Sequence, residues 1–131
     1  MRKDTNNWLD MAEYDLQTAE HMLEAGRYVY VIFMCHLSIE KTLKALVTEE
    51  TKKIPSETHD LLYLTQKAGA QFAPEMLDFV GMINNASIAT RYPTDFSRLI
   101  SSYPEEIASD YLKRTKEVVR WLKQDSRLKE S

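Results

Sequence analysis

The sequence predicts an all-α protein, an up-and-down bundle of about five helices. Only three glycines and four prolines interrupt its 131 residues, and apolar residues recur at helical rather than alternating spacing. The segments between the periodic stretches are short, as they are between antiparallel neighbours in a bundle. A chain of this length buries about two-thirds of its unfolded surface, so we expect residues 1–131 to form a single domain.

The first two helices are expected to form one long pair. Residues 6–25 carry one apolar face, and Gly26 suits the position just past a helix end. Residues 28–51 carry apolar side chains on several sides, as a helix packed against several neighbours does. We therefore expect the second helix to be the central one.

Charged residues interrupt the apolar arc of the second helix. His36 and Glu40 fall inside this arc, and Lys44 lies near its edge. Burying a lone carboxylate or ammonium costs several kcal/mol or shifts its pKa. The sequence therefore predicts partners for Glu40 and Lys44, or a cavity or interface where they meet solvent.

A third, shorter helix is expected to end near residue 68. Pro55 disfavours helical backbone at the residue before it, which ends the second helix. Thr58 can then cap the third helix, which places His59 and Asp60 in its first turn.

The fourth helix is expected to begin at Pro74, which suits a first turn, and to end before the next proline. Arg91 therefore lies at a helix end. A loop is expected over residues 94–101. Ser102 and Glu105 have capping-box spacing and start the last helix, and the polar residues after it are expected to fray.

Composition excludes several classes of protein. The formal net charge of −3 argues against a broad electrostatic footprint for duplex DNA, although a local basic cluster can still bind phosphate. Cys35 is the only cysteine, which excludes a disulfide-stapled secreted domain, and Cys/His spacing for zinc is absent. Without an apolar signal core or a run of about 18 apolar residues, we expect a cytoplasmic protein with no membrane contact. No Gly-rich phosphate loop or paired Glu-x-x-His motif occurs, so no metal or other cofactor is implied.

An ordered set of residues covers most of the chain. Its members are Trp8, Ala12, Asp15-Leu16, Ala19, Gly26, Tyr28, Phe33, Glu40-Lys41, Lys44-Ala45, Pro55, Thr58-His59-Asp60-Leu61, Leu64 and Arg91-Tyr92-Pro93. In this order and spacing they resemble the HEPN domain family, whose name abbreviates higher eukaryotes and prokaryotes nucleotide-binding. The resemblance implies a helical bundle that usually dimerises. In prokaryotes it also implies a minimal nucleotidyltransferase partner, with which such stand-alone proteins form toxin–antitoxin pairs.

The chain departs from the motif of the metal-independent ribonucleases in this family. In that motif an arginine is followed after roughly four to six residues by a histidine that moves protons near pH 7. The histidines here are His21, His36 and His59, and none follows an arginine at that spacing. Arg27 precedes His36 with eight residues between them, and no histidine follows Arg91. Whether the protein is an enzyme therefore stays open, with ribonuclease the only class favoured.

Two interpretations of the polar residues on the first two helices remain open. In one, Asp15, His36, Glu40 and Lys44 form a polar ladder, because i, i+4 spacing aligns the last three on one face, and this ladder binds a ligand. In the other, Asp15 pairs with Lys41 or Lys44 only to fix the register of the helices or to line a dimer interface.

Two further segments have both a binding and a structural interpretation. His59 near a helix start can meet an anionic ligand, or residues 58–60 only cap the helix. Arg91 and Tyr92 combine a guanidinium that can hold phosphate with a ring that can stack on a base. Alternatively, Arg91 satisfies terminal carbonyls while Tyr92 packs on the bundle. Arg98 is a candidate second phosphate contact.

Three hypotheses about function follow. The first is a helical homodimer that binds a nucleotide, RNA or a nucleotidyltransferase partner, using Arg91, Tyr92, His59 and Lys44 with Arg98 as an additional contact. The second is a ribonuclease toxin with a displaced pair, Arg91 with His59 or His36, in which the arginine stabilises the transition state and the histidine is the base. The third is a purely structural dimerisation module.

Overall fold

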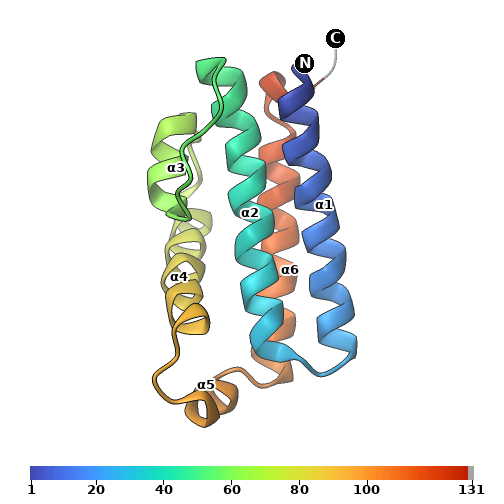
Figure 1. The fold of residues 1–131 in the computed structure, drawn as a ribbon, viewed down its shortest axis with the longest axis vertical. Helices are drawn as coiled ribbons and strands as arrows, with labels where there is room; N and C mark the ends of the chain where they lie inside the picture. The colour runs from blue at the N-terminus through green and yellow to red at the C-terminus, as the bar shows by residue number, and fades with distance from the viewer. Residues whose placement is uncertain (130–131) are drawn as a thin grey trace.

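The computed structural model describes residues 1–129, which form an all-α fold of six α-helices and one short 3₁₀ helix, without strands (Figure 1). In chain order the elements are α1 (Lys3–Glu24), α2 (Tyr28–Thr51), α3 (Leu61–Ala68), α4 (Pro74–Arg91), α5 (Phe96–Ser102), α6 (Glu105–Lys123) and η1 (Ser126–Leu128). The predicted fold class is confirmed. The sixth α-helix is α5, which lies where a loop was expected.

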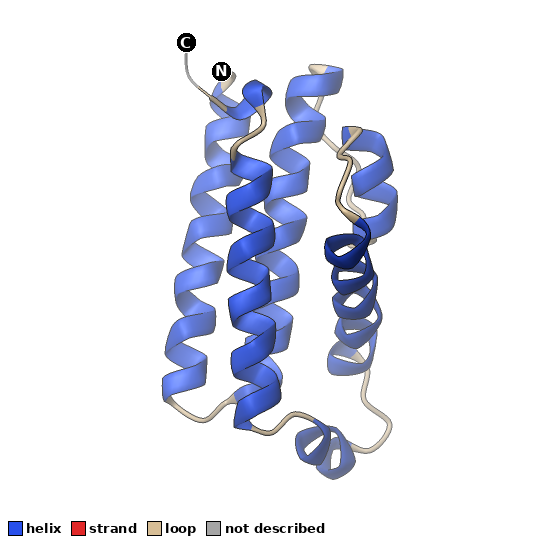
Figure 2. Ribbon diagram, turned by 180° about the vertical axis from the view of Figure 1, so that it is seen from behind, coloured by secondary structure: helices blue, strands red, loops and turns tan. Residues whose placement is uncertain are grey.

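Helix α2 is the centre of the bundle. Figure 1 shows α1 on one side of it, α3 and α4 on the other, and α6 behind; Figure 2 shows α6 from the opposite side, in front of α1 and α2. All four of these neighbours contact α2. Its buried apolar residues are Val29, Val31, Ile32, Cys35, Ile39, Leu43, Ala45, Leu46 and Val47. The apolar residues on several sides of this helix are explained by these neighbours.

Left-handed residues end the first three helices. Gly26 follows α1 with φ +74°, Lys52 follows α2 with φ 58°, and Gly69 follows α3 with φ 65°. Glycine adopts this conformation without a Cβ clash, which confirms Gly26 as a stop. Lys52 adopts it as a non-glycine residue, and the helix before it keeps the predicted bounds 28–51.

Helix α1 begins three residues earlier than predicted, and a side chain from the end of α2 anchors its start. The Glu49 carboxylate, at the end of α2, accepts hydrogen bonds from the Thr5 hydroxyl and from the Arg2 backbone N–H at 3.1 Å. The bond from Thr5 is the main reason that the pKa of the Glu49 carboxyl is lowered to about 2. A carboxylate on another helix thus anchors the residue before α1 and a hydroxyl of its first turn, and its negative charge lies near the positive end of the helix dipole.

The predicted cap of the third helix is wrong by two residues. The Asp60 carboxylate accepts from the backbone N–H groups of Leu62 at 3.0 Å and Tyr63 at 3.3 Å, so α3 begins at Leu61. The Thr58 hydroxyl accepts only from the Asp60 N–H. His59 therefore lies outside the helix, in the connection between α2 and α3.

Residues 94–101 were expected to form a loop, but most of them belong to α5. The Asp95 carboxylate accepts from the Arg98 N–H at 3.1 Å and caps this helix, while Leu99 is buried beneath it. Ser102 ends α5 and donates its hydroxyl to the Arg98 carbonyl, so the predicted capping box with Glu105 does not form. Pro104 precedes α6 instead.

The tail after Gln124 was expected to fray, but residues 125–129 are held in place; positions 130 and 131 lie outside the described residues. Leu128 in η1 is buried. The Arg127 guanidinium donates to the Glu50 carboxylate at 2.8 Å and to the Ala68 carbonyl at 2.7 Å. These contacts join the C-terminal segment to α2 and to the end of α3.

Cys35 is fully buried in α2. Burial raises the pKa of its thiol to about 12, so the group stays protonated at neutral pH. Within residues 1–129, no helix combines the length and apolarity needed to cross a membrane.

Candidate functional site

The charged residues predicted to need partners meet at one place, which we name the Glu40 cluster: His36, Glu40, Lys44, His59 and Arg91. The first three lie on α2 and are 1%, 3% and 5% exposed. The connection before α3 supplies His59, and Arg91 is the last residue of α4. Three separate segments thus bring four basic side chains around one carboxylate.

Both oxygens of Glu40 have partners. Oε2 lies 3.2 Å from Lys44 Nζ, and Oε1 lies 2.7 Å from His59 Nδ1. Arg91 Nη2 approaches the same Oε1 to 4.0 Å. The buried charge of Glu40 is therefore compensated, as the cost of burying a lone carboxylate requires.

His36 is held in one tautomer. Its Nε2 lies 2.9 Å from the His59 carbonyl, which only accepts, so Nε2 carries the proton and donates. Nδ1 faces Arg91 Nη2 at 3.4 Å and accepts from it. Burial, with a smaller contribution from the Arg91 charge, lowers the pKa of His36 to about 4. The imidazole is therefore neutral near pH 7, and it ties the connection before α3 to α2.

His59 is oriented by Glu40 and open to solvent. In its neutral form, donation from Nδ1–H to the carboxylate leaves Nε2 unprotonated. Its side chain is 57% exposed, against 3% for Glu40. A carboxylate behind an accessible imidazole is an arrangement that can bind an anion or move a proton.

Aromatic rings support the two cations of the cluster. Lys44 Nζ lies 5.4 Å from the centre of the Trp8 ring, and Arg91 Cζ lies 5.0 Å from the centre of the Phe33 ring. The Arg91 side chain is 17% exposed, and its buried Nε has no hydrogen-bond partner among the described residues. Arg91 thus has donor capacity that the protein does not use.

Asp15 does not join this cluster. It pairs with Lys41 at 2.5 Å between α1 and α2, while Lys44 turns to Glu40. Of the predicted ladder, His36, Glu40 and Lys44 lie together, and only Asp15 lies apart from them. The Asp15–Lys41 pair matches the interpretation in which these charges fix the register of the two helices.

Tyr92 and Arg98 lie outside the Glu40 cluster, in a hollow at the end of α4. Tyr92 is 81% exposed, and both side chains line a hollow of about 420 Å³ between the end of α4 and α5. Tyr92 does not pack on the bundle, contrary to its structural interpretation. The guanidinium of Arg98 makes no hydrogen bond or ion pair with any residue in 1–129.

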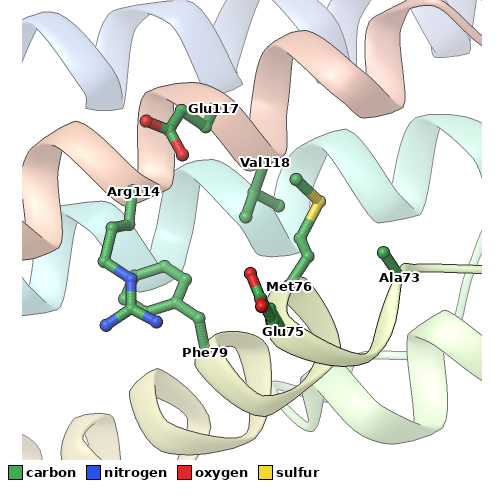
Figure 3. A pocket seen from close by; sticks show the side chains of 7 residues that line it. All are labelled: Ala73, Glu75, Met76, Phe79, Arg114, Glu117 and Val118. Atoms are coloured by element: carbon green, nitrogen blue, oxygen red, sulfur yellow. The ribbon is translucent and has the colours of Figure 1, made fainter.

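A different hollow, of about 210 Å³, lies between α4 and α6 and contains none of the predicted site residues (Figure 3). The Arg114 guanidinium stacks on Phe79 at 4.5 Å and pairs with Asp110 at 3.6 Å. Glu75 and Glu117 also border this hollow, so acids outnumber bases there. Its charge suits phosphate less well than that of the Glu40 cluster.

Several residues that build the site were not anticipated from the sequence. The Asn84 side chain of α4 accepts from the Leu61 N–H at 3.0 Å and donates to the Asp60 carboxylate at 3.3 Å. These bonds fix the start of α3 next to His59. Nothing in the spacing of a lone asparagine signals this role, and the aromatic supports Trp8 and Phe33 read as ordinary apolar positions.

The comparisons with known proteins agree with this fold. A sequence model of the HEPN domain matches residues 5–125. No curated protein matches the chain. The solved structure of TT1696 from Thermus thermophilus superposes with a TM-score of 0.78 at 17% identity, over 94% of this chain and 98% of that chain. ST0689, described as an archaeal HEPN homologue, superposes with a TM-score of 0.71 at 20% identity, over 94% and 97% of the two chains. The chain therefore belongs to the HEPN domain family.

Proposed function

We propose that the protein binds the phosphate of a nucleotide or of RNA at the accessible side of the Glu40 cluster, with Arg91 and His59 as the contact groups. The observation that carries this proposal is the convergence of Arg91 and His59 on Glu40 from different segments. Lys44 lies behind them, bonded to the same carboxylate.

The charge balance of the cluster supports an anionic ligand. Glu40 contributes one formal negative charge, and Lys44 and Arg91 contribute two positive charges, with both histidines counted as neutral. The excess of one positive charge lies where water is largely excluded, so it acts more strongly than a surface charge. The Arg91 side chain is 17% exposed, so a phosphate oxygen can approach it from the solvent side.

Arg91→Ala is expected to weaken nucleotide binding by about 10- to 100-fold, because a charge-assisted hydrogen bond contributes about 1.5–3 kcal/mol. Binding of uridine monophosphate and of a labelled oligouridylate is measured by fluorescence anisotropy and competition. Arg91→Lys keeps the positive charge but lacks the planar guanidinium, so it should lose less nucleotide affinity than Arg91→Ala.

Arg114→Ala is the matched control for this experiment. Arg114 also stacks on a phenylalanine ring and approaches a carboxylate, but it lies in the other hollow. Its removal should leave the affinity at the parent value. Equal affinity of the parent and Arg91→Ala, in folded protein, would contradict the proposal.

A displaced ribonuclease site is the second candidate function. It is favoured by the orientation of His59, whose Nδ1 bond to Glu40 leaves Nε2 free to act as a base beside Arg91. RNA cleavage in EDTA is then expected to fall at least about 100-fold in both His59→Ala and Arg91→Ala. Intact RNA with the parent protein, or cleavage that both variants retain, would leave binding as the function.

The proposal also includes two protein partners, a second copy of this chain and a minimal nucleotidyltransferase. Exposed apolar side chains on α4 and α5 support a protein interface there: Ile88, Phe96 and Ile100 are 63%, 53% and 51% exposed. Light scattering is expected to give the mass of two chains, and Phe96→Glu is expected to give one. A dimer that binds neither nucleotide nor RNA would favour the purely structural hypothesis, and co-purification with a co-expressed nucleotidyltransferase tests the other partner.

A further inference from the structure

The hollow beside Tyr92 differs in chemistry from the Glu40 cluster. Residues of α4, α5 and the segment between them line it, among them Tyr92, Thr94, Arg98 and Ser102. An exposed aromatic ring and an arginine with no partner among the described residues therefore share one open hollow. An aromatic ring for stacking and a cation for the backbone are the two groups that bind single-stranded nucleic acid without reading its sequence.

The end of α4 sends two neighbouring side chains to two places. Arg91 turns inward to His36 and Glu40, while the next residue, Tyr92, lines the outer hollow. Because the two residues are adjacent in the chain, a nucleotide that adjoins a phosphate at Arg91 can extend toward the ring of Tyr92. A mononucleotide fills one of these places, whereas a strand fills both.

One face of α5 carries polar side chains, and the other carries apolar ones. Arg98 and Ser102 line the hollow, whereas Phe96 and Ile100 line a separate, more apolar hollow with residues at the start of α2. A dimer formed through Phe96 and Ile100 would therefore leave Arg98 accessible. One acid opposes a phosphate here, because Asp95 lines the same hollow as Arg98.

We infer that this hollow is a second subsite, in which a base of single-stranded RNA stacks on Tyr92 and a phosphate of the strand contacts Arg98. This inference rests on the proposed phosphate site at Arg91, and it names the ligand of that site as an RNA strand rather than a mononucleotide. Preference for the strand over the mononucleotide is its measurable consequence.

The test compares an oligouridylate of about ten nucleotides with uridine monophosphate, by competition against the labelled oligomer. Tyr92→Ala and Arg98→Ala are each expected to lower the preference for the oligomer by about tenfold, the loss of one stacked base or one phosphate contact. Tyr92→Phe keeps the ring and should keep the preference. Arg98→Ala should also reduce the salt dependence of oligomer binding.

Asp95→Asn is expected to tighten binding of the oligomer, a gain that misfolding would not produce. Asparagine caps a helix as well as aspartate does, so α5 should persist while the opposing charge is removed. The oligomer is expected to bind several-fold more tightly to this variant than to the parent.

The results separate the two proposals. If Tyr92→Ala and Arg98→Ala keep the parent's preference while Arg91→Ala loses binding, the subsite is overturned and the phosphate site stands. If neither the oligomer nor the mononucleotide binds to the parent, the phosphate site fails and the subsite fails with it.

Discussion

Glu40→Met is expected to lower the free energy of unfolding by about 3–5 kcal/mol, the largest effect of a single substitution in the cluster. The new side chain has a suitable volume, but it leaves the buried Lys44 and the partly exposed Arg91 without their common anion. It also removes the acceptor of His59 Nδ1. Urea unfolding of the parent and the variant, followed by circular dichroism, gives the difference.

The double variant Glu40→Met with Lys44→Met tests that explanation. Removing both partners of a buried pair is often close to neutral, so the double variant should be more stable than Glu40→Met alone. Lys116→Met, on α6, breaks an ion pair with Glu20 in which the two side chains are 40% and 43% exposed, and should cost at most about 1 kcal/mol. A double variant that is less stable than the single one would show that packing, rather than uncompensated charge, causes the loss.

Acidification is expected to remove about 3 kcal/mol of stability through His36. Burial lowers its pKa from 6.5 to about 4, and this difference between the unfolded and folded states corresponds to about 3 kcal/mol. The unfolded chain binds the proton first, so the contribution is complete above about pH 6.5 and is lost as the pH falls to about 4. Chemical unfolding at a series of pH values measures the slope.

His36→Gln removes the titrating group and should flatten the profile between pH 6.5 and 4. Its amide can still donate to the His59 carbonyl, so the variant should fold. His21→Gln is the matched control, because His21 lies exposed on α1. Parallel profiles for the parent and His36→Gln would contradict the assignment of this pH dependence to His36.

Helix bounds were predicted best where local chemistry decides them. Pro74 and the residues before Pro93 define α4, and Gly26 ends α1, because proline and glycine restrict or release the backbone whatever surrounds them. The start of α1 was misplaced because the carboxylate that anchors it, Glu49, comes from another helix. Helix α5 was missed although Asp95 is a suitable cap, because so short a helix has no readable period.

The candidate site could be predicted only in part for the same reason. The position of Glu40 on an apolar arc indicated that it has partners, and the i, i+4 partner Lys44 followed from helix geometry. The approach of His59 and Arg91 depends on how α3 and α4 pack against α2, which no spacing along the chain encodes. The sequence also does not show which of two nearby lysines, Lys41 or Lys44, pairs with Asp15; the structure shows that it is Lys41.

The burial of Cys35 makes the natural protein a convenient host for chemical labelling. With the pKa of this thiol at about 12, far fewer than about one molecule in a thousand carries a thiolate at pH 7.5, and the sulfur has no exposed surface. A cysteine introduced at Ser97, which is exposed on α5, would be the one reactive thiol. A maleimide dye could then be attached next to the Tyr92 hollow without first replacing a native residue, and its emission would follow ligand binding in real time.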